Sequence, residues 1–128
     1  MSQINTTGAK AFVTAVAGLT RYQRVDLNGS GQLVVAGEDA KCIGFVDGFV
    51  GAATDIAIGD IVTVRLLTSA GTFKAIVNEA VAAGASLYAG ADGEVQDTDP
   101  GSGTIRFIAL EAGSADGSVI EVLPLVLN

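Results

Sequence analysis

The side chains in this chain that could take part in chemistry are mostly carboxylates. Its 128 residues include fourteen Asp and Glu, one Cys and no His. Ser-His-Asp and Cys-His catalysis need an imidazole base, and His/Cys metal sites need several such ligands. No Ser-x-x-Lys spacing indicates Ser-Lys catalysis. Cys42 lies in the apolar run Lys41–Val46, which predicts a buried, inert thiol. We therefore expect no enzyme and no cofactor.

One segment has the spacing of a calcium-binding loop. Asp26, Asn28 and Ser30 stand at positions 1, 3 and 5, and Gly31 stands at position 6. Position 12 needs a bidentate Glu, but that residue is Gly37. The flanking residues also have the pattern of strands rather than helices. A hairpin turn explains the same residues, so we expect no metal here.

Asp97 and Asp99 are the clearest pair of carboxylates. Glycosidases use two carboxyl groups held in a cleft, with the pKa of one of them raised. Here the pair stands beside the Pro/Gly-rich loop Asp99–Gly103. We interpret it as part of a solvated turn.

Turn signals divide the chain into short apolar runs. Asn28-Gly29, Asp92-Gly93 and Asp116-Gly117 favour the positive φ angles of tight hairpins. Only Asn78–Ala83 has helical propensity, and Gly84 limits it to at most two turns. The sequence therefore predicts an all-β protein, a compact small barrel or sandwich of about ten short strands. The expected strands are Ala11–Val16, Tyr22–Leu27, Gln32–Ala36, Cys42–Asp47, Asp60–Leu67, Thr72–Val77, Ser86–Ala89, Glu94–Asp97, Thr104–Leu110 and Val119–Leu127.

The N-terminal segment differs from the rest of the chain. Residues 1–10 are polar and without periodicity, so we expect an extended N-terminal arm before a single β domain at residues 11–128. The first residues lack a secretion signal. Ala11–Leu19, the longest uncharged apolar stretch near the start, has nine residues, whereas a membrane span needs about 20. We therefore expect no membrane partner.

Charge is distributed unevenly. Residues 1–24 contain Lys10, Arg21 and Arg24 and no acidic residue, a formal charge of +3. The remaining residues contain four cations and all fourteen acids, a formal charge of −10. An acidic body argues against nucleic acid as a partner, because phosphate backbones require a basic surface. The basic leading segment indicates that the two ends face different environments.

A weak internal repeat suggests two similar β modules. Alignment of residues 25–53 with 87–115 without gaps pairs Gly31 with Gly93 and Phe45 with Phe107. Its other identities are Ile43 with Ile105, Gly51 with Gly113 and Ala53 with Ala115. A shorter echo pairs residues 56–59 with residues 81–84.

Several segments resemble the capsid cement (head-decoration) proteins of tailed phages. The likeness covers most of residues 11–127 and consists of turn-and-strand patterns, at Ala57–Val64, Leu87–Val95, Gly103–Gly113 and Asp116–Val122. It implies a small all-β domain that binds the outside of an assembled capsid, often as a trimer. The implied partner is the major capsid protein, and the implied location is the exterior of a virion assembled in the host bacterial cytoplasm.

The same likeness implies a role for the N-terminal arm, which would add to the β-structure of the coat protein. Cations near such an arm would meet an acidic coat surface. Small, apolar, weakly aromatic β proteins also often bury surface against other copies, so we expect a homo-oligomer. The expected docking residues are Ser2, Gln3, Ile4, Asn5, Thr6, Thr7, Lys10, Arg21 and Arg24.

Two other functions fit the same pattern. One is another virion component, such as a head-fibre base or a tail-tube protein. The other is a carbohydrate-binding module, although such modules usually present rows of Trp or Tyr for stacking on sugars. This chain has no Trp and only Tyr22 and Tyr88, so this function ranks third.

Overall fold

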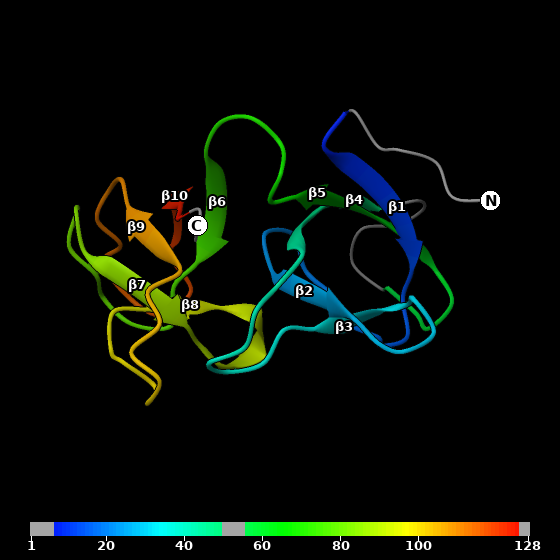
Figure 1. Ribbon diagram of the computed structural model, residues 1–128, viewed down its shortest axis with the longest axis horizontal. Helices are drawn as coiled ribbons and strands as arrows, with labels where there is room; N and C mark the ends of the chain where they lie inside the picture. The colour runs from blue at the N-terminus through cyan, green and yellow to red at the C-terminus, as the bar shows by residue number, and fades with distance from the viewer. Residues whose placement is uncertain (1–6, 50–55, 126–128) are drawn as a thin grey trace.

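The computed structural model describes residues 7–49 and 56–125, and it confirms the predicted all-β fold of ten short strands (Figure 1). A 3-10 turn, η1 (Ala91–Gly93), is the single helical element of the described residues. None of these residues forms a helix with the length and apolar character that a membrane span needs. The strands are β1 (Ala9–Val13), β2 (Arg24–Leu27), β3 (Leu33–Val35), β4 (Gly44–Phe49), β5 (Ile61–Leu66), β6 (Phe73–Ile76), β7 (Ser86–Ala89), β8 (Val95–Gln96), β9 (Phe107–Ala109) and β10 (Val119–Pro124).

Each predicted strand corresponds to an observed one, although most are shorter than expected. The largest difference at a strand start is in β9, which begins at Phe107 rather than Thr104. β1 begins at Ala9 instead of Ala11, so Lys10 belongs to the sheet and pairs with Val64. Asn78–Ala83 forms no helix and contains only an isolated bridge from Val81 to Gly113.

The strands form two five-stranded antiparallel sheets that lie side by side along the long axis of the molecule (Figure 1). The first sheet has the order β1-β5-β4-β2-β3, and the second has the order β6-β10-β9-β7-β8. The second order is the first with every strand number raised by five. The chain therefore contains the same topology twice, as the weak sequence repeat suggested.

Equivalent backbone features support this repeat. The amide of Thr14 donates to the Asp60 carbonyl at 3.0 Å, and the amide of Val77 donates to the Ser118 carbonyl at 2.9 Å. Three pairs of glycines with positive φ occupy matching positions, and L side chains rarely adopt such angles. They are Gly8 and Gly71 (79° and 94°), Gly31 and Gly93 (75° and 70°), and Gly59 and Gly117 (94° and 89°).

The gapless alignment is wrong by one residue in one strand of each module. Val46 pairs with Val64 in the first sheet, and Ala109 pairs with Val122 in the second. Phe45 therefore matches Ile108 and not Phe107. The pairing of residues 56–59 with residues 81–84 is also wrong, because the first segment precedes β5 and the second precedes β7. Gly51 and Ala53 lie outside the described residues.

Each sheet curves around an apolar core of its own. Strict alternation in β5 places Val62 and Val64 in the first core, while Ile61 on the opposite face is 47 % exposed. The first core consists of Leu19, Val25, Leu33, Val46, Ile56, Val62 and Val64. The second consists of Phe45, Phe73, Ala75, Val77, Val81, Leu87, Val95, Phe107, Ala109, Ile120 and Val122.

Phe45 joins the two cores, because its backbone belongs to the first sheet and its side chain to the second core. Its ring centroid lies 5.4 Å from that of Phe73 and 5.4 Å from that of Phe107. The contact with Phe107 is edge-to-face, with an interplanar angle of 63°. Such aromatic contacts stabilise a protein beyond the area that they bury.

Candidate functional site

The structure separates the predicted docking residues. Lys10 is exposed on β1, an edge strand of the first sheet, and its Nζ lies 5.5 Å from the centroid of the Phe12 ring. Arg21 is exposed in the turn before β2. Thr7 lies just before β1, and its hydroxyl donates to the Ala9 carbonyl at 3.3 Å. Ser2–Thr6 lie outside the described residues.

The prediction of Arg24 as a docking residue is wrong, because its side chain is fully buried. Its guanidinium donates to four backbone carbonyls, so its hydrogen-bonding capacity is used within the fold. The acceptors are Glu94 (2.9 Å), Ala40 (3.2 Å), Gly37 (3.1 Å) and Gly90 (2.7 Å). Burial lowers the pKa of Arg24 from its ordinary value. Arg24 therefore holds the second sheet to the first and cannot meet a partner.

Cys42 lies beside Arg24 and is half-buried. Burial raises the pKa of its thiol, because the thiolate is disfavoured away from water. This environment agrees with the predicted inert thiol.

The segment with calcium-like spacing is a hairpin turn between β2 and β3, as predicted. The side-chain oxygen of Asn28 accepts from the amides of Ser30 (2.9 Å) and Gln32 (3.0 Å). The Asp26 carboxylate pairs with the Lys41 ammonium at 3.0 Å. Throughout residues 7–49 and 56–125, no three His, Cys, Asp or Glu side chains are grouped as a metal site requires.

The predicted Asp97–Asp99 pair is not a pair in the structure. Asp99 accepts from the amides of Gly101 (2.8 Å) and Gly103 (3.0 Å), as expected of a turn. Asp97 instead interacts with Glu79, and the hydrogen bond between the two carboxyl groups raises the pKa of Glu79. Glu79 is largely solvated, so this arrangement lacks the enclosed cleft of a glycosidase.

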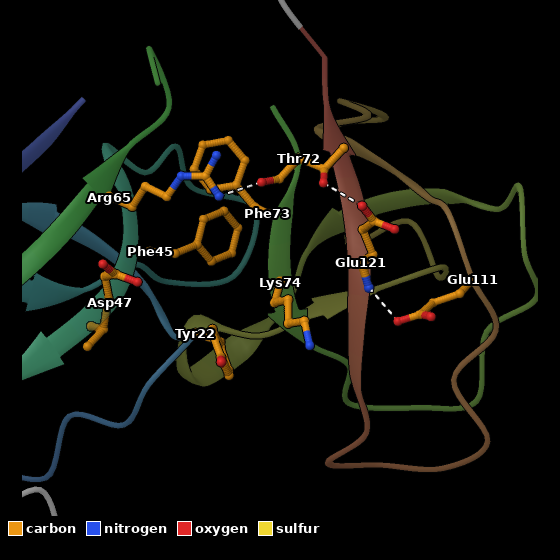
Figure 2. Close-up of a pocket in the computed structure, with 10 residues that line it drawn as sticks. Tyr22, Phe45, Asp47, Arg65, Thr72, Phe73, Lys74, Glu111 and Glu121 are labelled. Carbon is orange, nitrogen blue, oxygen red and sulfur yellow. Dashed lines mark hydrogen bonds between the residues drawn. The ribbon is translucent and has the colours of Figure 1, made fainter. Parts of the chain in front are cut away.

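A cavity of about 480 Å³ lies where the first sheet meets the edge strand β6 of the second. We call it the inter-sheet pocket. Small-molecule sites have volumes of roughly 300–1,000 Å³. Figure 2 shows Asp47 and Arg65 on one side of it, with Lys74, Glu121 and Glu111 on the other. The lining residues are Tyr22, Phe45, Val46, Asp47, Arg65, Thr72, Phe73, Lys74, Glu111 and Glu121.

Arg65 forms one wall of the pocket and is engaged within the protein. Its Cζ lies 4.2 Å from the centroid of the Phe73 ring, a cation–π contact. Its nitrogens donate to the Ser69 hydroxyl at 2.9 Å, to the Ala70 carbonyl at 2.6 Å and to the Thr72 carbonyl. Arg65 thus fixes the connection from β5 to β6 and, with it, the pocket wall.

Tyr22, also in the pocket wall, has a strained backbone. Its φ is 71°. Positive φ is uncommon for residues other than glycine, and especially for bulky ones. The equivalent position in the second module is Gly84, with a φ of 83°. The equivalence is set by matching hydrogen bonds, from the Tyr22 amide to the Val46 carbonyl (2.8 Å) and from the Gly84 amide to the Ala109 carbonyl (2.7 Å). Strain of this kind concentrates at functional sites.

The sequence interpretation missed the inter-sheet pocket. Its residues are scattered along the chain, and none belongs to a catalytic or ligand-binding motif. One signal was present, because the repeat alignment extended by three residues pairs Tyr22 with Gly84. The aromatic Tyr22 therefore stands where the other module has a glycine, and this difference is the signal of a strained turn.

Two groups of large apolar side chains are exposed. Val13 and Ile61, which pair between β1 and β5, are 41 % and 47 % exposed, and Ile58 in the preceding turn is 71 % exposed. On the second sheet, the exposed residues are Leu110, Val119, Leu123 and Leu125. Exposed apolar side chains that gather in this way are typical of interaction surfaces.

Comparison with known proteins identifies a structural neighbour. No protein-family model matches the chain, and no curated protein matches it by sequence. The fold is similar to the crystal structure of the head fiber gp8.5 N base in bacteriophage phi29, with a TM-score of 0.66. The similarity covers 91 % of this chain and 92 % of that chain at 18 % sequence identity. The two proteins share their fold over nearly their whole lengths.

Proposed function

We propose that this protein is a structural component of a phage virion, attached to the outside of an assembled capsid as the base of a head fibre. The observation that carries the proposal is the fold, which resembles a head-fibre base over 91 % of the chain. A decoration protein is the second candidate, favoured by the turn-and-strand likeness to cement proteins. Both functions use a binding surface and require no catalytic group.

The first sheet offers the better docking end for a capsid. Lys10 lies exposed on its edge strand β1, and Val13, Ile58 and Ile61 are exposed nearby. This end combines apolar area, which supplies affinity, with a cation that favours an acidic coat surface. The stretch Ser2–Thr7 leads directly into β1 and, in this proposal, adds to β-structure of the coat protein.

The position of the last strand fits a fibre base. β10 belongs to the second sheet, so a capsid bound at β1 would leave β10 on the other sheet. A further fibre segment or a second copy would attach there. A homo-oligomer, with a trimer as the expected form, stays a prediction.

The proposal is tested by co-sedimentation with heads of the phage that encodes the chain, compared with its unassembled coat protein. We expect binding to heads and little binding to free subunits, since docking needs a surface formed by assembly. Lys10→Glu should weaken binding by about tenfold, because it reverses the charge at the docking end. Lys41→Glu is the matched control, because Lys41 is an exposed cation outside this end whose pairing with Asp26 contributes little to stability.

One further variant completes the test. Deletion of residues 2–6 should weaken binding to heads, without changing the thermal unfolding of the free protein. Absence of the protein from sedimented heads, or equal binding to free coat subunits, would contradict the proposal. Open polymers of the isolated protein would instead indicate a tail-tube component.

A further inference from the structure

We propose that the inter-sheet pocket binds a neutral saccharide. The pocket lies at the junction of the two sheets, whereas the proposed capsid-docking end lies at β1, so the two proposals are independent. Three features of the pocket favour such a ligand: its free polar groups, their mixed charge, and wall residues that differ from the equivalent positions in the repeat.

Several polar groups of the pocket have free hydrogen-bonding capacity. Asp47 and Lys74 are exposed at the pocket, and in the described part of the chain neither side chain has a hydrogen bond or an ion-pair partner. Glu121 accepts from the Thr72 hydroxyl, and its own amide donates to Glu111 at 2.8 Å, so each carboxylate keeps an oxygen available. Acceptors and an ammonium donor from both sheets therefore line the same pocket.

The mixture of charges favours an uncharged ligand. Asp47, Glu111 and Glu121 would repel an anion, while Lys74 and Arg65 would repel a cation and offset most of its attraction to the three carboxylates. Arg65 is less available to bind an anion, since each of its three nitrogens already donates to a neutral group of the protein. A polyhydroxylated neutral molecule avoids both repulsions, because each hydroxyl can donate to a carboxylate and accept from an ammonium.

An aromatic side chain provides the apolar part of such a site. Tyr22 is half-buried in the pocket wall and presents a rigid ring with a polar hydroxyl. Sugars combine C–H faces with hydroxyl edges, so a Tyr ring among carboxylates matches both parts. The positive φ of Tyr22 costs stability that Gly84 avoids in the other module, which indicates that the ring is kept for a contact.

The pocket wall is also where the two modules differ in chemistry. Strand register makes Lys74 equivalent to Ala11 and Glu121 equivalent to Thr63. The apolar cores, in contrast, are matched by apolar residues, such as Val62 with Ile120 and Val64 with Val122. Packing alone does not require charged residues in one module only, so these differences indicate a site.

The test is an NMR titration of the ¹⁵N-labelled full chain with maltose, lactose and N,N′-diacetylchitobiose, and separately with arginine and inorganic phosphate. We expect at least one disaccharide to shift the amides of Tyr22, Asp47 and Lys74, with a dissociation constant of about 1 mM or tighter. Arginine and phosphate should shift these amides far less. Larger shifts with either charged probe, or no shift with any disaccharide, would overturn the proposal.

Matched variants locate the effect. Asp47→Ala should weaken disaccharide binding at least about tenfold, the effect of losing one charged hydrogen bond. Asp116→Ala, which removes an exposed acid outside the pocket, should leave binding unchanged. Tyr22→Gly should abolish binding yet fold normally, because glycine adopts the required φ without strain. Unchanged binding in Asp47→Ala and Tyr22→Gly would place the ligand elsewhere and overturn the proposal.

Discussion

At the scale of single residues, Arg24 and Arg21 show that neighbouring cations can have unrelated roles. Arg24 is buried among backbone carbonyls of connecting segments in both modules, whereas Arg21 is exposed. Hydrogen bonds to a charged group contribute about 1.5–3 kcal/mol each, and carbonyls left without a donor lose that stabilisation.

Arg24→Met should therefore lower the free energy of unfolding by at least about 3 kcal/mol. Arg21→Met should change it by no more than about 0.5 kcal/mol, as is usual for exposed positions. Urea denaturation followed by far-UV circular dichroism measures both. A loss below about 1 kcal/mol for Arg24→Met would show that the carbonyls find other donors.

The sequence shows that both residues are cations, but it does not show which of them is buried. Arg24 is buried because the turn around η1 approaches β2 so closely that a Cβ on Gly93 would lie 2.8 Å from the Arg24 carbonyl oxygen. That approach joins residues about seventy positions apart, and no local pattern encodes it. The residues of the inter-sheet pocket are assembled in the same non-local way.

At the scale of elements, local sequence signals predicted the number and the order of the strands. Ten strands were predicted in the right order, because apolar runs and turn residues act over a few positions. The predicted strand ends were less accurate, because a strand ends where its pairing with a neighbouring strand ends. β10 shows this, because Leu123 and Pro124 extend past the last β6 partner and pair with β9 alone. Pro124 lacks an amide proton, and no β6 partner lies beside it.

The hairpin turn between β2 and β3 allows a test of turn chemistry. A Cβ added at Gly29 or at Gly31 would meet only open space, but of the two residues only Gly31 has a positive φ, of 75°. Gly31→Ala should lower the free energy of unfolding by about 1 kcal/mol, and Gly29→Ala should leave it unchanged or raise it slightly.

Gly93, the equivalent of Gly31 in the second module, extends the series. It combines a φ of 70° with a Cβ position 2.5 Å from Cγ of Gln23, so Gly93→Ala should cost more than Gly31→Ala. Thermal unfolding of Gly29→Ala, Gly31→Ala and Gly93→Ala measures the loss of stability in each variant and so gives their order. Equal effects of Gly29→Ala and Gly31→Ala would mean that backbone conformation does not limit this turn.

At the scale of the whole molecule, the arrangement of the two sheets could not be predicted from the sequence. Turn signals specify which strands follow one another, but the order β1-β5-β4-β2-β3 depends on pairing between distant segments. The repeat did indicate two similar modules. It could not show that Phe45 leaves the first core and completes the second, because a shift of one residue moves a side chain to the opposite face.

This placement of Phe45 makes the stability of the second sheet depend on the first. Phe45→Ala removes a ring that contacts Phe73 and Phe107, and such truncations cost about 3–5 kcal/mol. We expect hydrogen exchange at the Val122 amide, in the second core, to accelerate as much as exchange at Val64 in the first. Phe12→Ala, which truncates a half-buried ring against the first core alone, is the control and should cost less.

The result decides whether the modules fold as one unit. Two sheets that share an aromatic side chain and the carbonyl contacts of Arg24 should unfold in a single transition, because the second core is incomplete without Phe45 of the first sheet. If Val122 keeps its wild-type protection in Phe45→Ala while Val64 loses protection, the second sheet is stable alone. In that case, the inter-sheet pocket would lie between two independent modules, and its width would vary as they move.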